Sequence, residues 1–342
     1  MNKKVAVTVF IALAVCVLAA TFLMGAWGVS RGSDDTSASL PAPKSDAPRE
    51  YRYPDFYRGI YLNSQSGNSM KRLAAFIEKA KSARINAMVI DVQTGSMKPA
   101  VTPAEHVSMC IAAGIHPIAR VVVFPDGLRM HPVPHELMEE RISVAEAACK
   151  AGYREIQFDY IRFNDHGILR HITNQEKYAF IASFFNRARA RLAKYDVKIA
   201  ADVFGRIPLN KEDPIGQKME SLDGVVDIIC PMAYPSHYTW SRKLMAEPYF
   251  TVFTTSKKAK ERVRKAEIVS WIQAFTLRVN RSPLSYDKYI EEQIRAVHDA
   301  GIRGYLLWNA SQQYDVPLAV CRQYYSRSTR VADATAPAPS AD

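Results

Sequence analysis

The sequence is poor in the residues and motifs that build metal, redox and dinucleotide sites. It contains 5 cysteines and 8 histidines in 342 residues, and no two cysteines stand at metal-ligand spacing. It has neither the HExxH motif of zinc peptidases nor the GxGxxG fingerprint of dinucleotide-binding folds. The nearest approach to a metal pair is His131 and His135, which flank Pro132 and Pro134. We therefore expect no metal and no cofactor.

Acidic residues are also in the minority. The chain has 34 Asp and Glu residues against 45 Lys and Arg residues, which gives a formal net charge of +11. The basic residues are densest between Lys257 and Lys265. A solvated helix face is the simpler explanation, and attraction to an anionic cell-envelope surface is the functional alternative. The sequence contains no recognisable nucleic-acid-binding motif, so nucleic acid is not an expected partner.

The N-terminus carries one long apolar run. Residues 5–29 are apolar apart from Thr8, Thr21 and two glycines, and they follow Lys3 and Lys4. A bilayer-spanning helix needs roughly 20 apolar residues, whereas the core of a signal peptide has about 7–15. Residues 1–31 are therefore predicted to be an uncleaved signal anchor, a single transmembrane helix in the inner or cytoplasmic membrane. The rest of the chain would lie outside the cytoplasm, in the periplasm or at the cell surface. Cleavage near residues 25–26, which would release a secreted protein, is the alternative.

Two further segments are too polar to fold on their own. Residues 32–54 consist mainly of Ser, Ala, Pro and charged residues, and residues 327–342 are similar. Such segments cannot bury enough apolar surface to offset the entropy lost on ordering. We predict a disordered tether and a disordered tail, which leave residues 55–326 as one folded domain.

Strand-like and helical runs alternate within this domain. Helical spacing is clearest in residues 70–82 and 174–194. Glycines stand where helices are expected to end, at Gly114, Gly152, Gly224 and Gly301. The strand-like runs are residues 58–62, 87–92, 116–124, 155–161, 198–204, 227–234, 268–275 and 304–309. Eight such repeats predict an α/β fold, a (β/α)8 TIM barrel. A doubly wound sheet with the same element order is the alternative.

The parity of the strands places several charged residues inside the barrel. Side chains in a barrel strand alternate between the interior and the helix layer. By this rule Asp91, Asp159 and Asp202 face inward, and Arg120 does the same. A charged group at the end of a buried strand is costly unless it faces a polar cavity, so this series indicates one shared site.

These segments resemble a bacterial family of glycoside hydrolases, once catalogued as a domain of unknown function, with a TIM-barrel catalytic domain. The resembling residues are 58–61, 86–92, 114–120, 155–163, 201–205, 231–238 and 306–310. The resemblance covers nearly the whole barrel in the right order, and it implies hydrolysis of glycosidic bonds. The connection after the third strand, residues 124–134, is shorter than in the family, which puts the shape of the substrate groove in question.

Glycosidases use two carboxyl groups that flank the scissile bond. One donates a proton to the leaving oxygen, and the other attacks the sugar or activates a water. Related barrel glycosidases often carry the nucleophile at the end of the fourth strand. The resemblance therefore implies Asp159 as nucleophile or base and Asp202 as acid, with Asp91 as a third candidate.

Sugar binding needs flat aromatic faces and hydrogen-bonding groups. The main candidates at or near the carboxyl ends of the strands are Tyr61, Arg120, Gln157, Arg162, Tyr234, His237, Trp271, Gln273, Trp308 and Asn309, and Tyr160 and Tyr238 also lie there. Core packing is the alternative for each aromatic residue, above all for Trp271 and for Tyr160, whose parity points outward. Arg120 and Arg162 are also the candidate ion-pair partners of the carboxylates.

Together these patterns predict a glycoside hydrolase that acts on an extracellular or cell-envelope polysaccharide by two-carboxylate acid/base chemistry. A catalytically silent barrel that binds glycan and scaffolds envelope partners is the main alternative. A different hydrolase or lyase on the same barrel, including a metal-assisted one, is the third possibility.

Overall fold

The computed structural model describes residues 51–335, with side chains described up to residue 327. The predicted anchor, almost all of the predicted tether and the end of the predicted tail lie outside these residues. Within the described part, no helix combines the length and the apolar character needed to cross a membrane.

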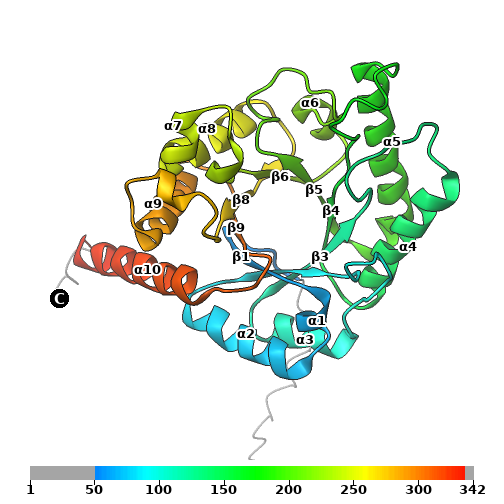
Figure 1. The fold of residues 1–342 in the computed structure, drawn as a ribbon. Helices are drawn as coiled ribbons and strands as arrows, with labels where there is room; N and C mark the ends of the chain where they lie inside the picture. Colours follow the sequence, from blue (N-terminus) through cyan, green and yellow to red (C-terminus); the bar gives the residue numbers. More distant parts are fainter. Residues whose placement is uncertain (1–50, 336–342) are drawn as a thin grey trace, which may run out of the picture. The chain divides into compact units, whose positions relative to one another are not determined.

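Parallel strands form a closed barrel at the centre of the domain (Figure 1). The strands are β1 (Tyr57–Leu62), β2 (Ala87–Asp91), β3 (His116–Val122), β4 (Glu155–Asp159), β5 (Lys198–Phe204), β6 (Ile228–Met232), β7 (Glu267–Ile268), β8 (Ser270–Gln273) and β9 (Gly304–Trp308). Strands β1 to β6 pair in chain order, and β9 pairs with both β8 and β1. Because the sheet closes on itself, the predicted TIM barrel is confirmed and the doubly wound sheet is excluded.

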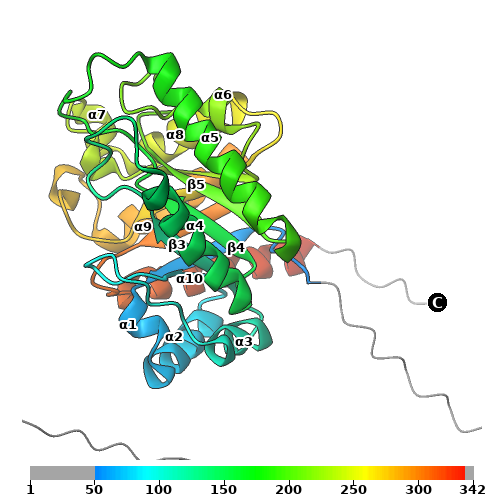
Figure 2. The ribbon, with the colours of Figure 1, turned by 90° about the vertical axis from the view of Figure 1, so that its right-hand side faces the viewer.

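Helices surround the barrel, as Figures 1 and 2 show from two directions. They are α1 (Ser64–Gly67), α2 (Met70–Ser82), α3 (Ala104–Ala112), α4 (His135–Lys150), α5 (Asn174–Leu192), α6 (Met219–Leu222), α7 (Arg242–Ala246), α8 (Pro248–Glu261), α9 (Tyr286–Ala300) and α10 (Asp315–Thr335). Three short 3-10 segments are η1 (Ala193–Tyr195), η2 (Pro235–His237) and η3 (Val279–Arg281). The start of α5 is fixed by a capping box, in which Thr173 and Glu176 satisfy each other's backbone N–H groups.

Three details differ from the expectations drawn from the sequence. The seventh barrel strand is split into β7 and β8, which both pair with β6 on either side of Val269. Gly114, Gly152 and Gly301 have positive φ, as expected at helix ends, but Gly224 is not among the positive-φ glycines. Helix α10 continues past residue 326, where the tail was expected to begin. No proline or glycine interrupts the chain there before Pro337, so nothing in the sequence stops the helix earlier.

Buried side chains divide into two groups according to strand parity. One cluster fills the barrel interior and includes Val89, Ile118, Cys230 and Trp271. The larger cluster lies between the strands and the helices and includes the alternate positions of the same strands, such as Met88, Ile156, Phe158 and Ala201. The predicted inward parity of the second, fourth and fifth strands is thereby confirmed.

A buried polar group closes the amino-terminal end of the interior. Glu155 begins β4 and is 1% exposed. Its Oε2 accepts a hydrogen bond from the Tyr57 hydroxyl at 3.0 Å and lies 3.0 Å from His116 Nε2. The carboxyl group is therefore satisfied at the base of the barrel, on the same face of β4 as Asp159 at the opposite end.

Closure of the barrel depends on a glycine in β9. Gly304 has φ +138°, and a Cβ added there would lie 2.2 Å from the Tyr57 carbonyl oxygen and 2.5 Å from its nitrogen. We expect Gly304→Ala to lower the free energy of unfolding by about 3 kcal/mol or more, because β1 and β9 must separate. Urea unfolding monitored by circular dichroism measures the change.

Gly224→Ala is the matched control for this prediction, since no atom lies within 4 Å of the added Cβ. It should change stability by less than about 0.5 kcal/mol. Equal effects of the two substitutions would contradict this account of barrel closure.

Candidate active site

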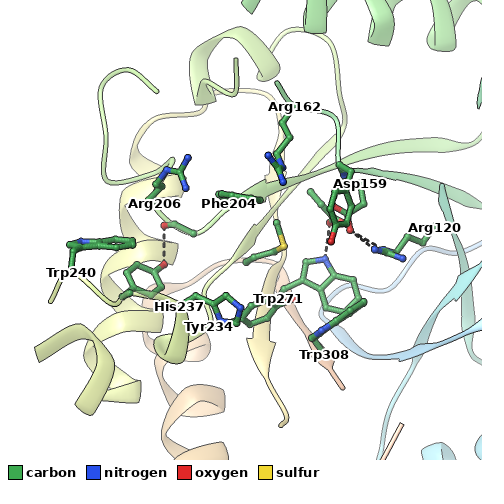
Figure 3. A pocket seen from close by; sticks show the side chains of 15 residues that line it. Arg120, Asp159, Arg162, Phe204, Arg206, Tyr234, His237, Trp240, Trp271 and Trp308 are labelled. Carbon is green, nitrogen blue, oxygen red and sulfur yellow. Dashed lines mark hydrogen bonds and ion pairs between the residues drawn. The ribbon is translucent and has the colours of Figure 1, made fainter. Parts of the chain in front are cut away.

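A cavity of about 410 Å³ opens at the carboxyl ends of the strands (Figure 3). Pockets of this size accommodate small molecules or a few sugar rings. The lining residues are Arg120, Asp159, Tyr160, Arg162, Asp202, Phe204, Gly205, Arg206, Met232, Tyr234, His237, Tyr238, Trp240, Trp271 and Trp308. Two of the three predicted catalytic aspartates, Asp159 and Asp202, therefore face the same cavity. This is the end of the barrel at which TIM-barrel enzymes carry their active sites.

Arg120 on β3 holds two of the aspartates in place. Its Nε and Nη2 donate to Asp159 Oδ2 at 3.0 and 2.6 Å, and its Nη1 donates to Asp91 Oδ1 at 2.6 Å. Burial alone would lower the pKa of Arg120, but the two carboxylates outweigh burial and raise that pKa well above its usual value. The expected ion pairs of Arg120 are therefore present, and the guanidinium stays charged.

Asp159 is held on both of its oxygens. Oδ2 receives the two bonds from Arg120, and Oδ1 accepts the backbone N–H of Tyr160 at 2.6 Å. The hydrogen bonds from a guanidinium and a backbone amide therefore engage both carboxylate oxygens. The side chain is thus fixed in orientation at the wall of the cavity.

Asp91 lies behind Arg120 and does not line the cavity. Its Oδ2 accepts a hydrogen bond from the Tyr61 hydroxyl at 2.5 Å. The Tyr61 ring in turn packs against Trp308, with ring centroids 4.2 Å apart. Asp91 and Tyr61 therefore support Arg120 and Trp308 from behind.

Asp202 occupies a different environment from Asp159. It is 1% exposed, and Oδ1 accepts a hydrogen bond from Trp271 Nε1 at 2.7 Å. Burial raises the pKa of Asp202 well above its ordinary value, the charge of Asp159 raises it further, and Arg120 and Trp271 only partly oppose these effects. A raised pKa favours the protonated form of the carboxyl group, which is the form that can serve as a proton donor.

Aromatic side chains form much of the remaining wall (Figure 3). Trp308 lies perpendicular to Trp271, with ring centroids 5.4 Å apart. Burial, with the charges of Asp202 and Asp159, raises the pKa of Tyr234 well above its ordinary value, so its hydroxyl stays neutral. Burial and Arg278 lower the pKa of His237. Apart from the arginines, Asp159, Asp202 and His237, the wall consists of aromatic and apolar residues and is suited to the C–H faces of sugars.

Besides Tyr61, three predicted binding residues do not line the cavity. Gln157 is fully buried deeper in β4 and does not line the cavity. Gln273 accepts a hydrogen bond from the Ser236 backbone and donates to the carbonyls of residues 275 and 277. Asn309 donates to the carbonyls of residues 274 and 313. The chain turns back directly after β8 and β9, and these amides satisfy the backbone groups exposed by the turns.

Tyr160 and Tyr238, which the sequence placed near strand ends, both line the cavity. Strand parity points Tyr160 outward, but its φ of +53° takes it out of the strand alternation. Four other lining side chains were not identified from the sequence. Phe204 and Arg206 follow Asp202 at intervals of two residues, and Met232 stands between the inward positions 230 and 234. Strand parity could have indicated these three residues. Trp240 follows η2 in a loop, where no periodic signal exists.

The short connection after β3 packs against the connection after β4. Leu128 bridges to Phe163, and the Leu128 N–H donates to the Arg162 carbonyl at 2.9 Å. Gly127 has φ +81°, and a Cβ there would lie 2.7 Å from the Phe163 carbonyl oxygen and 2.9 Å from Arg162 Nη1. The short loop therefore holds Arg162 at the cavity wall. Arg162 was expected to pair with a catalytic carboxylate, but it approaches Asp165 instead, at 3.4 Å.

Two other sequence features lie away from the cavity. Within residues 51–335, no group of three or more His, Cys, Asp or Glu side chains is placed to hold a metal ion. The basic run lies on the second half of α8 and beyond it, where Arg262 bonds Glu220 and the remaining residues are largely exposed.

Several solved glycoside hydrolase structures share the fold of this chain. The glycoside hydrolase domain of PgaB (BpsB) from Bordetella bronchiseptica has a TM-score of 0.60 at 12% identity, over 79% of this chain and 98% of that one. The endo-beta-1,4-mannanase from Thermotoga petrophila has a TM-score of 0.58 at 13% identity, over 80% and 77%. The spore cortex-lytic enzyme SleL of Bacillus cereus has a TM-score of 0.54 at 13% identity, over 79% and 74%.

These identities establish a shared TIM-barrel fold and nothing finer. No curated protein matches the chain by sequence. A family model described as "Putative glycosyl hydrolase domain" matches residues 128–314, which is more than half of the chain. The matched part contains Asp159, Asp202 and most of the cavity wall. The chain therefore belongs to this glycosyl hydrolase family.

Proposed function

We propose that the chain hydrolyses glycosidic bonds with Asp159 and Asp202 as its two catalytic carboxyl groups. The proposal rests on the different environments of these two aspartates, which line the same cavity. Asp159 is ion-paired with Arg120, whereas Asp202 is buried against Trp271 and has a raised pKa. A carboxyl group of raised pKa beside a second carboxyl group is typical of glycosidases.

In this mechanism Asp202 donates its proton to the oxygen of the departing sugar as the glycosidic bond breaks. Asp159 stabilises the oxocarbenium-like charge, either by attacking the anomeric carbon or by taking a proton from an attacking water. Arg120 and the Tyr160 amide fix Asp159 before substrate arrives, so no reorientation is needed during the reaction. If Asp159 has attacked, water then cleaves the bond between the sugar and Asp159 and gives its proton to Asp202. If Asp159 has taken a proton from the attacking water, it releases that proton to solvent and Asp202 regains one from solvent.

A glycan-binding barrel without turnover is the second candidate. It is favoured by the full set of hydrogen bonds on Asp159, which occupies both oxygens in the absence of substrate. On this reading Asp159 is a structural partner of Arg120, and the cavity serves recognition alone.

The substrate proposed for the hydrolase is an extracellular or cell-envelope polysaccharide. This location rests on the predicted N-terminal anchor. A reporter fused after Arg31 should be active only outside the cytoplasm, and the chain should stay in the membrane fraction after carbonate washing. Activity of the reporter in the cytoplasm would contradict the proposed location.

A substrate screen tests the function directly. The full chain is incubated with bacterial exopolysaccharides and peptidoglycan fragments, and new reducing ends are measured with and without a chelator. Hydrolysis that is insensitive to the chelator supports the proposal. Chelator-sensitive hydrolysis would support the metal-assisted alternative, and saturable binding without cleavage of any glycan would support the silent barrel.

A further inference from the structure

Arg162 is a buried cation with little compensation from the protein. It is 8% exposed and lines the cavity. Its Nη1 donates to the Phe163 carbonyl at 3.2 Å and reaches Asp165 Oδ2 only at 3.4 Å. Its Nε is buried and has no hydrogen-bond partner. A buried guanidinium with an unused donor is costly, and a ligand that supplies an acceptor would offset that cost.

The surrounding residues fix the direction in which Arg162 points. Its guanidinium lies 4.7 Å from the centre of the Phe204 ring and 5.6 Å from that of Tyr160, and it extends into the cavity in Figure 3. Gly127 leaves room for Nη1, as described above. Nη1 is engaged by the protein and Nε is buried, so Nη2 is the guanidinium nitrogen left to meet an oxygen of a carboxylate or sulfate in the cavity.

A second arginine stands near Arg162 at this part of the cavity. Arg206 also lines it, 4.9 Å from the centre of the Phe204 ring. Arg206 is paired with Asp213 and Asp165, but neither of these aspartates lines the cavity. Among the lining residues, the arginines Arg120, Arg162 and Arg206 outnumber the aspartates Asp159 and Asp202, and Asp159 is bound by Arg120. Arg162, whose contact with Asp165 is long, is therefore the lining arginine with the least compensation from the protein.

We infer that Arg162 is a specificity-determining residue that binds a negatively charged substituent, a carboxylate or a sulfate, on a sugar seated in this cavity. The inference deepens the proposed function, because it names acidic glycans as the substrate class. Recognition of the anion needs no turnover, so it can be tested separately from hydrolysis.

Tryptophan fluorescence reports on this site. The chain has 4 tryptophans, and Trp240, Trp271 and Trp308 line the cavity. The full chain is titrated with D-glucuronate, D-galacturonate and glucose 6-sulfate, and with glucose and galactose as neutral counterparts. We expect saturable quenching by at least one acidic sugar, with an affinity at least about 10-fold above that of its neutral counterpart. The uronates and the sulfate ester distinguish the two kinds of anion.

Substitutions assign the effect to Arg162. Arg162→Gln should weaken binding of the acidic sugar by roughly 10- to 100-fold and leave that of the neutral sugar little changed. Arg141→Gln is the matched control, because Arg141 is also buried, donates to a backbone carbonyl and pairs with an exposed glutamate, but lies outside the cavity. It should leave the acidic preference intact.

Equal binding of acidic and neutral sugars by the unaltered chain would overturn the inference, whether or not Arg162→Gln folds. So would an acidic preference that survives Arg162→Gln, or the lack of quenching by every acidic sugar. Fluorescence measures binding and not hydrolysis. If acidic sugars bind as expected but no glycan is hydrolysed, the proposed function is wrong and the inference about Arg162 still holds.

Discussion

Replacing Asp159 with asparagine is expected to lower the rate of glycan hydrolysis by ~10³-fold or more, because the amide cannot stabilise the positive charge of the transition state. Glycan binding should persist, since shape and most hydrogen bonding are kept. The substitution also weakens the ion pair with Arg120, so the free energy of unfolding should fall by about 2 kcal/mol. Reducing-end assays and urea unfolding measure the two effects.

Asp213→Asn is the matched control for Asp159→Asn. Asp213 is 3% exposed, pairs with Arg206 and accepts a backbone N–H, but it does not line the cavity. Its replacement should cost stability by a similar amount while lowering hydrolysis by less than about 10-fold. If both variants lose activity equally, Asp159 acts through the fold and is not a catalytic group.

Replacing Asp202 with asparagine is expected to change stability in the opposite direction. Folding raises the pKa of this carboxyl group, so the group stabilises the fold in its protonated form. This contribution to the free energy of unfolding is complete below the pKa of the unfolded chain, and it is lost as the pH rises through the pKa of the folded chain. That loss begins at about pH 4, the ordinary aspartate value. Asparagine carries no charge to desolvate, and its oxygen can still accept the bond from Trp271. At neutral pH Asp202→Asn should therefore raise the free energy of unfolding, and at pH 3 the gain should disappear.

The same variant should lose activity in a way that depends on the leaving group. A glycan with a poor leaving group needs proton donation, so its hydrolysis should fall by ~10²-fold or more. An activated aryl glycoside should be affected far less. Loss of stability on Asp202→Asn, or an equal loss of activity on both kinds of substrate, would contradict the assignment of Asp202 as a buried acid.

The barrel and its interior residues could be predicted from the sequence because both follow from short-range periodicity. Strand parity placed Asp159, Asp202 and Arg120 on one face, and the structure brings them to one wall. The same rule failed at Tyr160, because the left-handed backbone there ends the alternation that the rule assumes.

The loops were less predictable because their hydrogen-bond partners are distant in the sequence. Gln273 and Asn309 stand at strand ends, where sugar ligands are expected, but they satisfy backbone carbonyls of returning loops. The environment of Arg162 depends on Gly127, thirty-five positions earlier, which no local pattern connects to it. Parity identifies which residues face a site, whereas loop packing decides which of them are free to bind a ligand.

The central claim is that Asp202 works as a buried acid beside Asp159, and the pH dependence of kcat/KM tests it most directly. On the substrate that the screen identifies, the unaltered chain should lose activity on the alkaline side, as Asp202 releases its proton at a pKa raised by burial and by Asp159. On an activated aryl glycoside, Asp202→Asn should retain activity without that alkaline limb. An alkaline limb that is unchanged in Asp202→Asn would show that another group supplies the proton, and the two-carboxylate account would be wrong.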